Sequence, residues 1–311
     1  MTGTFVSIGN GTQEFSRLLD EVKRISDCLP QPVVVQHGRS RFTSTSIAHF
    51  DFTDEAGFLE RLNACSLFIT HGGGGSVFSA IRAHKRPVVV PRRKIFDEIV
   101  DDHQVYFAQE LARQGKIVPV YDVAGLARAA ADVAADPQVA DDSADIAQAV
   151  AAVREAVHAF APNTDDPVLL VTPSGGHLTE MRNLAPCYED RPHHYVINMP
   201  IIETPAMVGR TTTISVSQRD WKFFVNLGEA MVILRRERPR VILTTGGGFS
   251  VAFTLVAKLL RIPTVYVETV AKVVIPTATG RVMYRLADRF FYQWPYLQKF
   301  FPTGHYIGLI L

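Results

Sequence analysis

The four consecutive glycines Gly72, Gly73, Gly74 and Gly75 are the residues of this sequence best suited to hold a ligand. They follow an apolar run, Leu67 to Thr70, and precede a helical pattern that begins at Ser76, so the segment predicts a strand, a glycine loop and a helix. In such a loop the backbone N–H groups can approach a ligand closely, and the N-terminus of a helix carries partial positive charge. We therefore expect a phosphate site capped by Ser76, with a plain tight turn as the alternative.

Two further glycine clusters stand on the same kind of connection. Gly175 and Gly176 follow Ser174, and Gly246, Gly247 and Gly248 follow another apolar run; each cluster precedes a helical pattern. A single dinucleotide-binding fold explains only one such loop. The chain of 311 residues, 47% of them hydrophobic, is long enough for two packed cores. We predict an α/β protein with two Rossmann-like, doubly wound domains that face a cleft, at residues 1–160 and 161–311.

Composition and motifs exclude several classes of function. The formal net charge of +1 gives no general attraction for nucleic acid, and we expect no nucleic-acid partner. The three cysteines, Cys28, Cys65 and Cys187, are far apart, which predicts neither a disulfide framework nor a zinc site. No Asp-x-Asp motif occurs, and we expect neither a metal nor another cofactor. Because the first residues lack the features of a signal peptide and no run of about 18 apolar residues is free of charge, we expect a cytoplasmic location.

Two residues of the second half are candidates for a general base. His177 follows Gly176 at the predicted start of a helix, where the helix dipole favours a neutral imidazole; it could instead cap the helix or bind phosphate. Glu268 ends the predicted strand Thr264 to Val267, and the carboxyl ends of strands border the crevice of a doubly wound sheet. Its alternative is an ion pair with Lys272, four residues further on. The sequence leaves the choice between His177 and Glu268 open.

Several motifs, in order, resemble those of a known enzyme class. HGGGGS, KRPVVVP and DDHQVYFAQEL resemble the donor-binding half of GT-B glycosyltransferases, and are most similar to the small catalytic subunit of the eukaryotic two-subunit N-acetylglucosamine transferase. VTPSGGHLTEM, RERPRVILTTGGGFS, TVYVETVAK and YQWPYLQKFFPTGHYIG resemble the membrane-associated partner subunit. The paired bacterial exopolysaccharide glycosyltransferases share this pattern. The resemblance covers nearly the whole chain, with the donor-type half first, whereas GT-B enzymes usually place the acceptor domain first.

This resemblance implies an inverting, metal-independent transfer of a sugar from a UDP-sugar to a polyprenyl-diphosphate-linked saccharide, forming a β-1,4 bond. It leaves open which UDP-sugar is used; UDP-GlcNAc is among the candidates, and Arg92, Arg93 or Lys94 could bind the carboxylate of a uronic acid donor. The implied donor-binding residues are Asn10, Gly11, His71, Gly72, Gly73, Gly74, Gly75, Ser76, His103 and Gln104. The implied acceptor-binding residues are Ser174, Gly175, Gly176, Gly246, Gly247 and Gly248. For His71 a buried core histidine is the alternative, and for His103 and Gln104 a solvated first helical turn.

Two other functions fit the same fold. A UDP-sugar 2-epimerase shares the two-domain architecture and needs no second substrate. A non-catalytic nucleotide-sugar-binding partner could assist a separate membrane transferase, although the joint presence of His103, Gln104, His177 and Glu268 argues against it.

A predicted helix from Asp220 to Glu237 combines aromatic and basic residues. Trp221 and Phe224 lie near its start, and Arg235 and Arg236 lie near its end. Such a helix suits an anionic membrane surface, while a core helix with a solvated end is the alternative. We expect these four residues to face the membrane, with the protein peripheral on the inner face of the cytoplasmic membrane.

Overall fold

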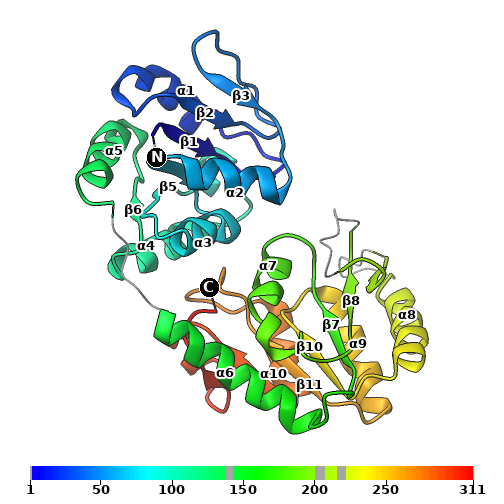
Figure 1. Ribbon diagram of the computed structural model, residues 1–311. Coiled ribbons are helices and arrows are strands. Elements are labelled where there is room, and N and C mark those ends of the chain that lie inside the picture. Colours follow the sequence, from blue (N-terminus) through cyan, green and yellow to red (C-terminus); the bar gives the residue numbers. More distant parts are fainter. Residues whose placement is uncertain (1, 138–142, 200–206, 216–221, 311) are drawn as a thin grey trace. The chain divides into compact units, whose positions relative to one another are not determined.

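The computed structural model describes residues 2–137, 143–199, 207–215 and 222–310. Its contacts divide the chain into two compact units at residues 141 and 142 (Figure 1). Each unit is a parallel sheet with helices on both faces. The α/β class and the two doubly wound domains predicted from the sequence are confirmed.

In the first unit the described residues form a parallel sheet with the strand order β3-β2-β1-β4-β5-β6. The strands are β1 (Thr4–Ser7), β2 (Val33–Gln36), β3 (Ala48–Phe50), β4 (Leu67–His71), β5 (Val88–Val90) and β6 (Val118–Pro119). The helices are α1 (Ser16–Arg24), α2 (Glu55–Ala64), α3 (Gly74–Arg82), α4 (His103–Arg113) and α5 (Leu126–Ala135). Helices α1 and α5 contribute to the core on one face of the sheet, and α2 and α3 contribute to the core on the other.

In the second unit the described residues form a parallel sheet with the order β13-β12-β11-β10-β7-β8-β9. The strands are β7 (Val168–Val171), β8 (His193–Ile197), β9 (Thr211–Thr213), β10 (Val241–Thr244), β11 (Thr264–Val267), β12 (Arg289–Tyr292) and β13 (His305–Tyr306). The helices are α6 (Ser143–Phe160), α7 (Gly176–Asn183), α8 (Lys222–Glu237), α9 (Gly248–Leu259) and α10 (Ala278–Leu286). Helices α6 and α7 pack on one face, and α8 and α9 pack on the other.

Helix α6 belongs to the second unit, although the sequence placed the domain boundary after it, at residue 160. Its buried side chains Ala149, Val153 and Val157 lie in one hydrophobic cluster with Val168 and Val241 of the second sheet. The alanine-rich pattern indicated a helix but not the sheet against which it packs. The contacts therefore divide the chain before α6 rather than after it.

Both sheets reverse their strand order at an equivalent place. In the first sheet β1 pairs with both β2 and β4, and in the second β7 pairs with both β8 and β10. The loops that leave β1 and β4, or β7 and β10, run in opposite directions, which opens a crevice at the carboxyl ends of these strands where ligands bind in such folds. All three glycine clusters of the sequence follow one of these strands.

Candidate functional site

The first glycine cluster joins β4 to α3. Helix α3 begins at Gly74, with Gly73 as its N-cap, and the carbonyl of Gly73 accepts from Val77 N–H at 3.2 Å. Ser76 therefore lies in the first turn, and the prediction that it caps the helix is wrong, because the helix starts two residues earlier than the side-chain pattern indicated. The N–H groups of Gly74, Gly75 and Ser76 belong to the first turn, where an α-helix offers no acceptor of its own. They can bind an anion.

His71 is held between two glycines. A Cβ on Gly9 or on Gly73 would overlap the His71 imidazole, so a glycine is required on each side of the ring. Burial, followed by the positive charge of Arg92, lowers the pKa of His71 to about 3. The ring is therefore neutral at physiological pH. It is packed at the base of the glycine loop, where it borders the predicted phosphate site.

Gln104 and His103 begin α4 beside this loop. Gln104 is buried, its side-chain oxygen accepts from the backbone N–H of Arg92 at 3.0 Å, and a Cβ on Gly72 would lie 2.9 Å from Gln104 Cβ. The Nδ1 atom of His103 contacts Asp101 Oδ1, which also accepts from His103 N–H at 3.1 Å. Gln104 is thus fixed against the glycine loop, and the solvated first turn considered as its alternative does not describe it.

The loop after β1 completes this edge of the first unit. Asn10 and Gly11 are exposed, and a Cβ on Gly11 would lie 3.6 Å from Arg92 Nη2. The predicted donor-binding residues therefore come from the ends of β1 and β4 and the start of α4, which the fold gathers at one sheet edge.

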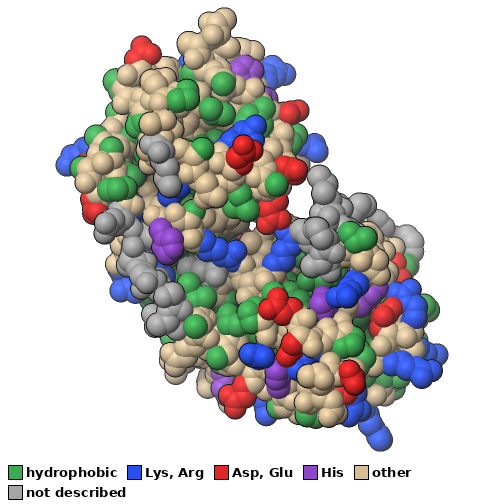
Figure 2. Space-filling model, in the orientation of Figure 1, with side chains coloured by type: hydrophobic (Ala, Val, Ile, Leu, Met, Phe, Trp, Pro, Cys, Tyr) green, Lys and Arg blue, Asp and Glu red, His purple; other side chains and the backbone are tan. Residues whose placement is uncertain are grey.

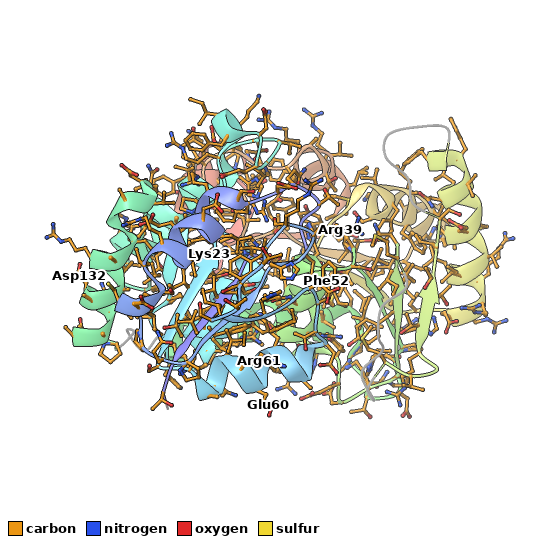
Figure 3. All side chains as sticks on the ribbon, turned by 90° about the horizontal axis from the view of Figure 1, so that it is seen from above. Lys23, Arg39, Phe52, Glu60, Arg61 and Asp132 are labelled. Carbon is orange, nitrogen blue, oxygen red and sulfur yellow. The ribbon has the colours of Figure 1, made fainter. Side chains whose placement is uncertain are left out.

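Two residues at this edge were missed by the sequence analysis. Arg39 follows β2 and Phe52 follows β3, and they lie on adjacent loops (Figure 3). Phe52 is 45% exposed, although it is a large aromatic side chain. A Cβ on Gly38 would lie 2.8 Å from the carbonyl oxygen of Gly9 and 3.9 Å from Phe52, so these loops pack tightly against the turn after β1. No motif marked them, because only the order of strands brings their loops beside the turn after β1.

In the second unit, β7 leads to α7 through Ser174, Gly175 and Gly176. Gly175 is the N-cap, with a φ of 86°, and no atom lies within 4 Å of a Cβ on either glycine. Ser174 is held in place, because its N–H donates to Asn198 Oδ1 at 3.0 Å and its hydroxyl donates to the Met199 carbonyl at 3.0 Å. The start of α7 is therefore open on its outer side, as a ligand site must be.

His177 lies in the first turn of α7. Its Nδ1 is 2.8 Å from the carbonyl oxygen of Thr245, which can only accept, so Nδ1 carries the proton and the lone pair is on Nε2. Burial lowers the pKa of His177. The imidazole is thus neutral at physiological pH and held in the tautomer that can take a proton through Nε2.

The loop between β10 and α9 lies directly beside His177. A Cβ on Gly246 would be 3.3 Å from the Tyr266 hydroxyl and 3.6 Å from His177 Cε1, and a Cβ on Gly247 would overlap Pro173. Gly248 is the first residue of α9. The two glycine loops of the second unit therefore meet at the ends of β7 and β10, and they place Tyr266 at the same edge.

Glu268 follows β11 and is fully buried. Thr277 Oγ1 donates to its carboxylate at 3.0 Å, Thr269 N–H donates at 3.2 Å, and the Tyr266 hydroxyl also hydrogen-bonds to it. A Cβ on Gly280 would overlap Glu268 Oε2, so this carboxylate rests against the N-terminus of α10. Burial raises the pKa of Glu268 to about 7.

A second buried carboxyl group, Glu180, was not predicted. Its Oε1 accepts from Thr269 Oγ1 at 2.8 Å and from Val270 N–H at 3.1 Å, whereas its buried Oε2 has no hydrogen-bond partner. Burial raises the pKa of Glu180 to about 8. Its spacing of three residues from His177 on a predicted helix was the available signal, because residues three apart share a helix face.

Helix α8 carries the predicted membrane-facing residues. Phe224 is 73% exposed, and Arg235 and Arg236 are exposed. Lys and Arg side chains gather at this helix in the space-filling view (Figure 2). Trp221 lies outside the described residues. None of the helices among the described residues is both long enough and apolar enough to cross a membrane.

In the part of the chain that the structure describes, no group of three or more His, Cys, Asp or Glu side chains is arranged to hold a metal ion.

The packing of His71 yields a test of the first glycine loop. Gly73→Ala should lower the free energy of unfolding of the first unit by about 1–3 kcal/mol, because its Cβ overlaps the imidazole. Gly75→Ala is the matched control: its Cβ meets nothing within 4 Å, and alanine in the helix should be neutral or stabilising by up to about 1 kcal/mol. Native-state hydrogen exchange of the first unit measures both changes. Equal effects of the two substitutions would contradict the observed packing.

The unpartnered Oε2 of Glu180 predicts a pH-dependent stability. The pKa of Glu180 rises from 4.5 to about 8 on folding, so the unfolded chain loses this proton first and the second unit loses stability as pH rises through this window. Glu180→Gln keeps an oxygen acceptor and cannot ionise. Between pH 5 and 7 wild type should therefore lose stability relative to this variant by up to about 1.4 kcal/mol per pH unit.

Tryptophan fluorescence during denaturant unfolding measures this difference, because both tryptophans, Trp221 and Trp294, belong to the second half of the sequence. Glu155→Gln, on an exposed position of α6, is the control. Parallel stability curves for wild type and Glu180→Gln would show that Glu180 is ionised in the folded protein.

Comparison with known families assigns each half separately. Residues 5–158 match the glycosyltransferase family 28 C-terminal domain. Residues 206–310 match the family described as oligosaccharide biosynthesis protein Alg14 like. The first match includes α6, which packs in the second unit.

Two curated relatives are subunits of a UDP-N-acetylglucosamine transferase. The UDP-N-acetylglucosamine transferase subunit ALG14 of Homo sapiens is 25% identical, over 46% of this chain and 82% of its own length. The subunit ALG13 of Yarrowia lipolytica is 40% identical over 90 residues, which are 26% of this chain and 42% of that protein. Among solved structures, UDP-GlcNAc 2-epimerase from Methanocaldococcus jannaschii aligns over 85% of this chain and 83% of its own, with 10% identity and a TM-score of 0.22.

The motifs of both halves and the two family matches agree in order along the chain. The protein resembles a fusion of the two subunits of the eukaryotic UDP-N-acetylglucosamine transferase, with the glycosyltransferase family 28 half first and the Alg14-like half second.

Proposed function

We propose that this protein is a glycosyltransferase that moves N-acetylglucosamine from UDP-GlcNAc to a polyprenyl-diphosphate-linked saccharide. The observation that carries the proposal is the presence, in one chain, of both halves that its relatives hold as separate subunits of a UDP-N-acetylglucosamine transferase. Each half has an open glycine loop at the point where its strand order reverses. One loop suits the donor and the other suits the acceptor.

The first unit binds the donor in this proposal. The N–H groups of Gly74, Gly75 and Ser76 hold the diphosphate at the positive end of α3. Asn10 and Gly11 border the nucleotide, and neutral His71 supports the loop from below. His103 and Gln104 contact the donor sugar from the start of α4. Because backbone donors and a helix dipole face the diphosphate, we propose that transfer requires no metal ion.

The second unit supplies the base. Both His177 and Glu268 were candidates, and the geometry favours His177, because its Nε2 carries a free lone pair whereas Glu268 is fully buried and bonded to Thr277. We propose that Nε2 takes the proton from the acceptor hydroxyl while that oxygen attacks the anomeric carbon. The bond from this carbon to the diphosphate breaks, and UDP leaves with the negative charge. Glu268 positions the loop after β11.

The stereochemistry follows from this single displacement. Attack from the face opposite the leaving group converts the α-linked sugar of UDP-GlcNAc into a β-linked product, so the proposed transferase is inverting. The 1,4 position of the new bond is proposed from the likeness to the two eukaryotic subunits. Ser174, Gly175 and Gly176, with Gly246, Gly247 and Gly248, border the diphosphate end of the acceptor.

A lipid-linked acceptor requires contact with a membrane. We propose that α8 docks the second unit on the cytoplasmic face, with Phe224 inserted and with Arg235 and Arg236 near anionic headgroups. The exposed aromatic side chain near the start of α8 and the exposed arginines near its end support this orientation.

The transfer reaction is tested with His177→Asn. The asparagine amide can still donate to the Thr245 carbonyl, as Nδ1 does, but it has no equivalent of Nε2. We expect kcat to fall by about 100- to 10,000-fold, while the calorimetric Kd for UDP-GlcNAc changes less than twofold. In wild type the acid limb of the pH profile should have its midpoint below the ordinary histidine value, because burial lowers the pKa of His177.

The assay follows transfer of labelled sugar to a short polyprenyl-diphosphate-linked saccharide, with and without EDTA, over a panel of UDP-sugars. Full activity of His177→Asn would rule out this base and return the role to Glu268. Conversion of UDP-GlcNAc to its 2-epimer without an acceptor would identify an epimerase instead. Binding without turnover would identify a non-catalytic partner, and loss of activity in EDTA would overturn the metal-independent mechanism.

Membrane docking is tested with vesicles that contain anionic phosphatidylglycerol. Arg235→Gln and Arg236→Gln should each weaken binding about fivefold, since a cation at an anionic surface contributes about 1 kcal/mol. Phe224→Ser should also weaken binding, because it removes apolar area that would enter the membrane interface. Arg39→Gln removes an equal charge from the first unit and should have little effect. Cosedimentation measures all four variants. An equal loss in Arg39→Gln would indicate a general charge effect rather than docking through α8.

A further inference from the structure

Arg92 is a buried cation beneath the glycine loop of the first unit. It follows Pro91 after β5 and is only 3% exposed. Its guanidinium donates to four backbone carbonyls, those of Ile8 at 3.1 Å, Gln13 at 2.9 Å, Glu14 at 3.2 Å and Glu98 at 3.3 Å. It also lies over the Phe15 ring, 4.6 Å from the centroid. Arg92 is therefore not the exposed contact for a uronic acid carboxylate that the sequence allowed.

The charge of Arg92 is only partly balanced. Glu98 is the acidic side chain that raises the pKa of Arg92, while burial lowers it to about 10, so the guanidinium remains protonated at neutral pH. The Glu98 carboxylate itself is engaged by Arg17, at 2.9 and 3.0 Å, and by the N–H of Arg93 at 3.0 Å. Arg92 reaches only the backbone oxygen of Glu98. This group of two cations and one anion thus carries one excess positive charge.

Arg92 is linked to the glycine loop by a short series of contacts. Arg92 holds the turn after β1 through the carbonyls of Ile8, Gln13 and Glu14. Its own N–H is bound by Gln104, which packs against Gly72. The charge of Arg92 also acts on His71, whose pKa it lowers together with burial. Arg92 therefore acts on the N-terminus of α3 in two ways, through its contacts with the neighbouring loops and through its electrostatic potential.

We propose that Arg92 is a positioning residue whose buried charge makes the first unit selective for the diphosphate of a nucleotide over an uncharged nucleoside. It fixes the loops after β1 and β5 and adds a positive potential to that of the α3 N-terminus. The same potential stabilises the negative charge that develops on UDP as it leaves. This inference rests on the proposed transfer from a UDP-sugar, and it assigns to that site a residue that need not touch the ligand.

The test compares the affinities of the full-length protein for UDP and for uridine by calorimetry. A purely structural residue would change both affinities alike, whereas a charge changes their ratio. Arg92→Gln should reduce the preference for UDP over uridine by about tenfold. Arg92→Lys keeps the charge and should keep the ratio within about twofold, even where its poorer contacts with the carbonyls weaken both ligands. Arg93→Gln, a neighbouring cation that lies over Phe96 instead, is the matched control.

The outcomes separate this inference from the proposed function. If wild type binds no UDP, both fall. If wild type binds UDP and Arg92→Gln keeps the same ratio, the inference on Arg92 is wrong and the proposed transferase stands. Where Arg92→Gln fails to fold, Arg92→Lys decides: an unchanged ratio supports the role of the charge, and a tenfold lower ratio overturns it. An equal effect of Arg93→Gln would also overturn it.

Discussion

The reversal of strand order at β1 and β4, and again at β7 and β10, is the constraint on which both candidate sites depend. A parallel sheet places the carboxyl ends of its strands at one edge, and the reversal sends the following loops apart. Loops that are distant in the sequence, such as those after β1 and β5, therefore meet at the same edge. The chemistry of each unit is determined by which side chains its sequence places at this edge.

In both units a glycine at this edge allows a polar side chain of the same unit to pack closely against the backbone. In the first unit, Gly73 lets the loop close over a neutral imidazole, so the ring supports the backbone that faces the ligand. In the second unit, Gly280 lets the Glu268 carboxylate approach the N-terminus of α10. In each case the missing Cβ makes room for a polar side chain of the same unit, and the position of that side chain then fixes the loop.

The sequence predicted most of the fold but only part of the sites. The apolar run Leu67 to Thr70 located β4 to within one residue, and the predicted strand Thr264 to Val267 coincides with β11, because buried parallel strands have this pattern. The prediction from the sequence misplaced the start of α3, because glycines give no side-chain signal. The prediction also assigned α6 to the first half, because a helical pattern does not identify the sheet against which the helix packs. Glu180 was missed as a site residue, and Arg92 was considered only as a contact for a donor carboxylate, because their roles depend on burial and on backbone partners that no local motif encodes.

The two candidate sites differ in the charged groups that are buried beside them, and this difference matches their proposed roles. In the first unit Arg92 donates to neutral carbonyls and keeps its positive charge beneath the loop that is proposed to hold a diphosphate. The second buries two carboxyl groups, whose pKa values are raised to about 7 for Glu268 and about 8 for Glu180. Glu180 is therefore mostly protonated at neutral pH and contributes little negative charge, whereas Glu268, with a pKa of about 7, is about half ionised there. His177 stays neutral because burial lowers its pKa, which suits the base proposed for the second unit.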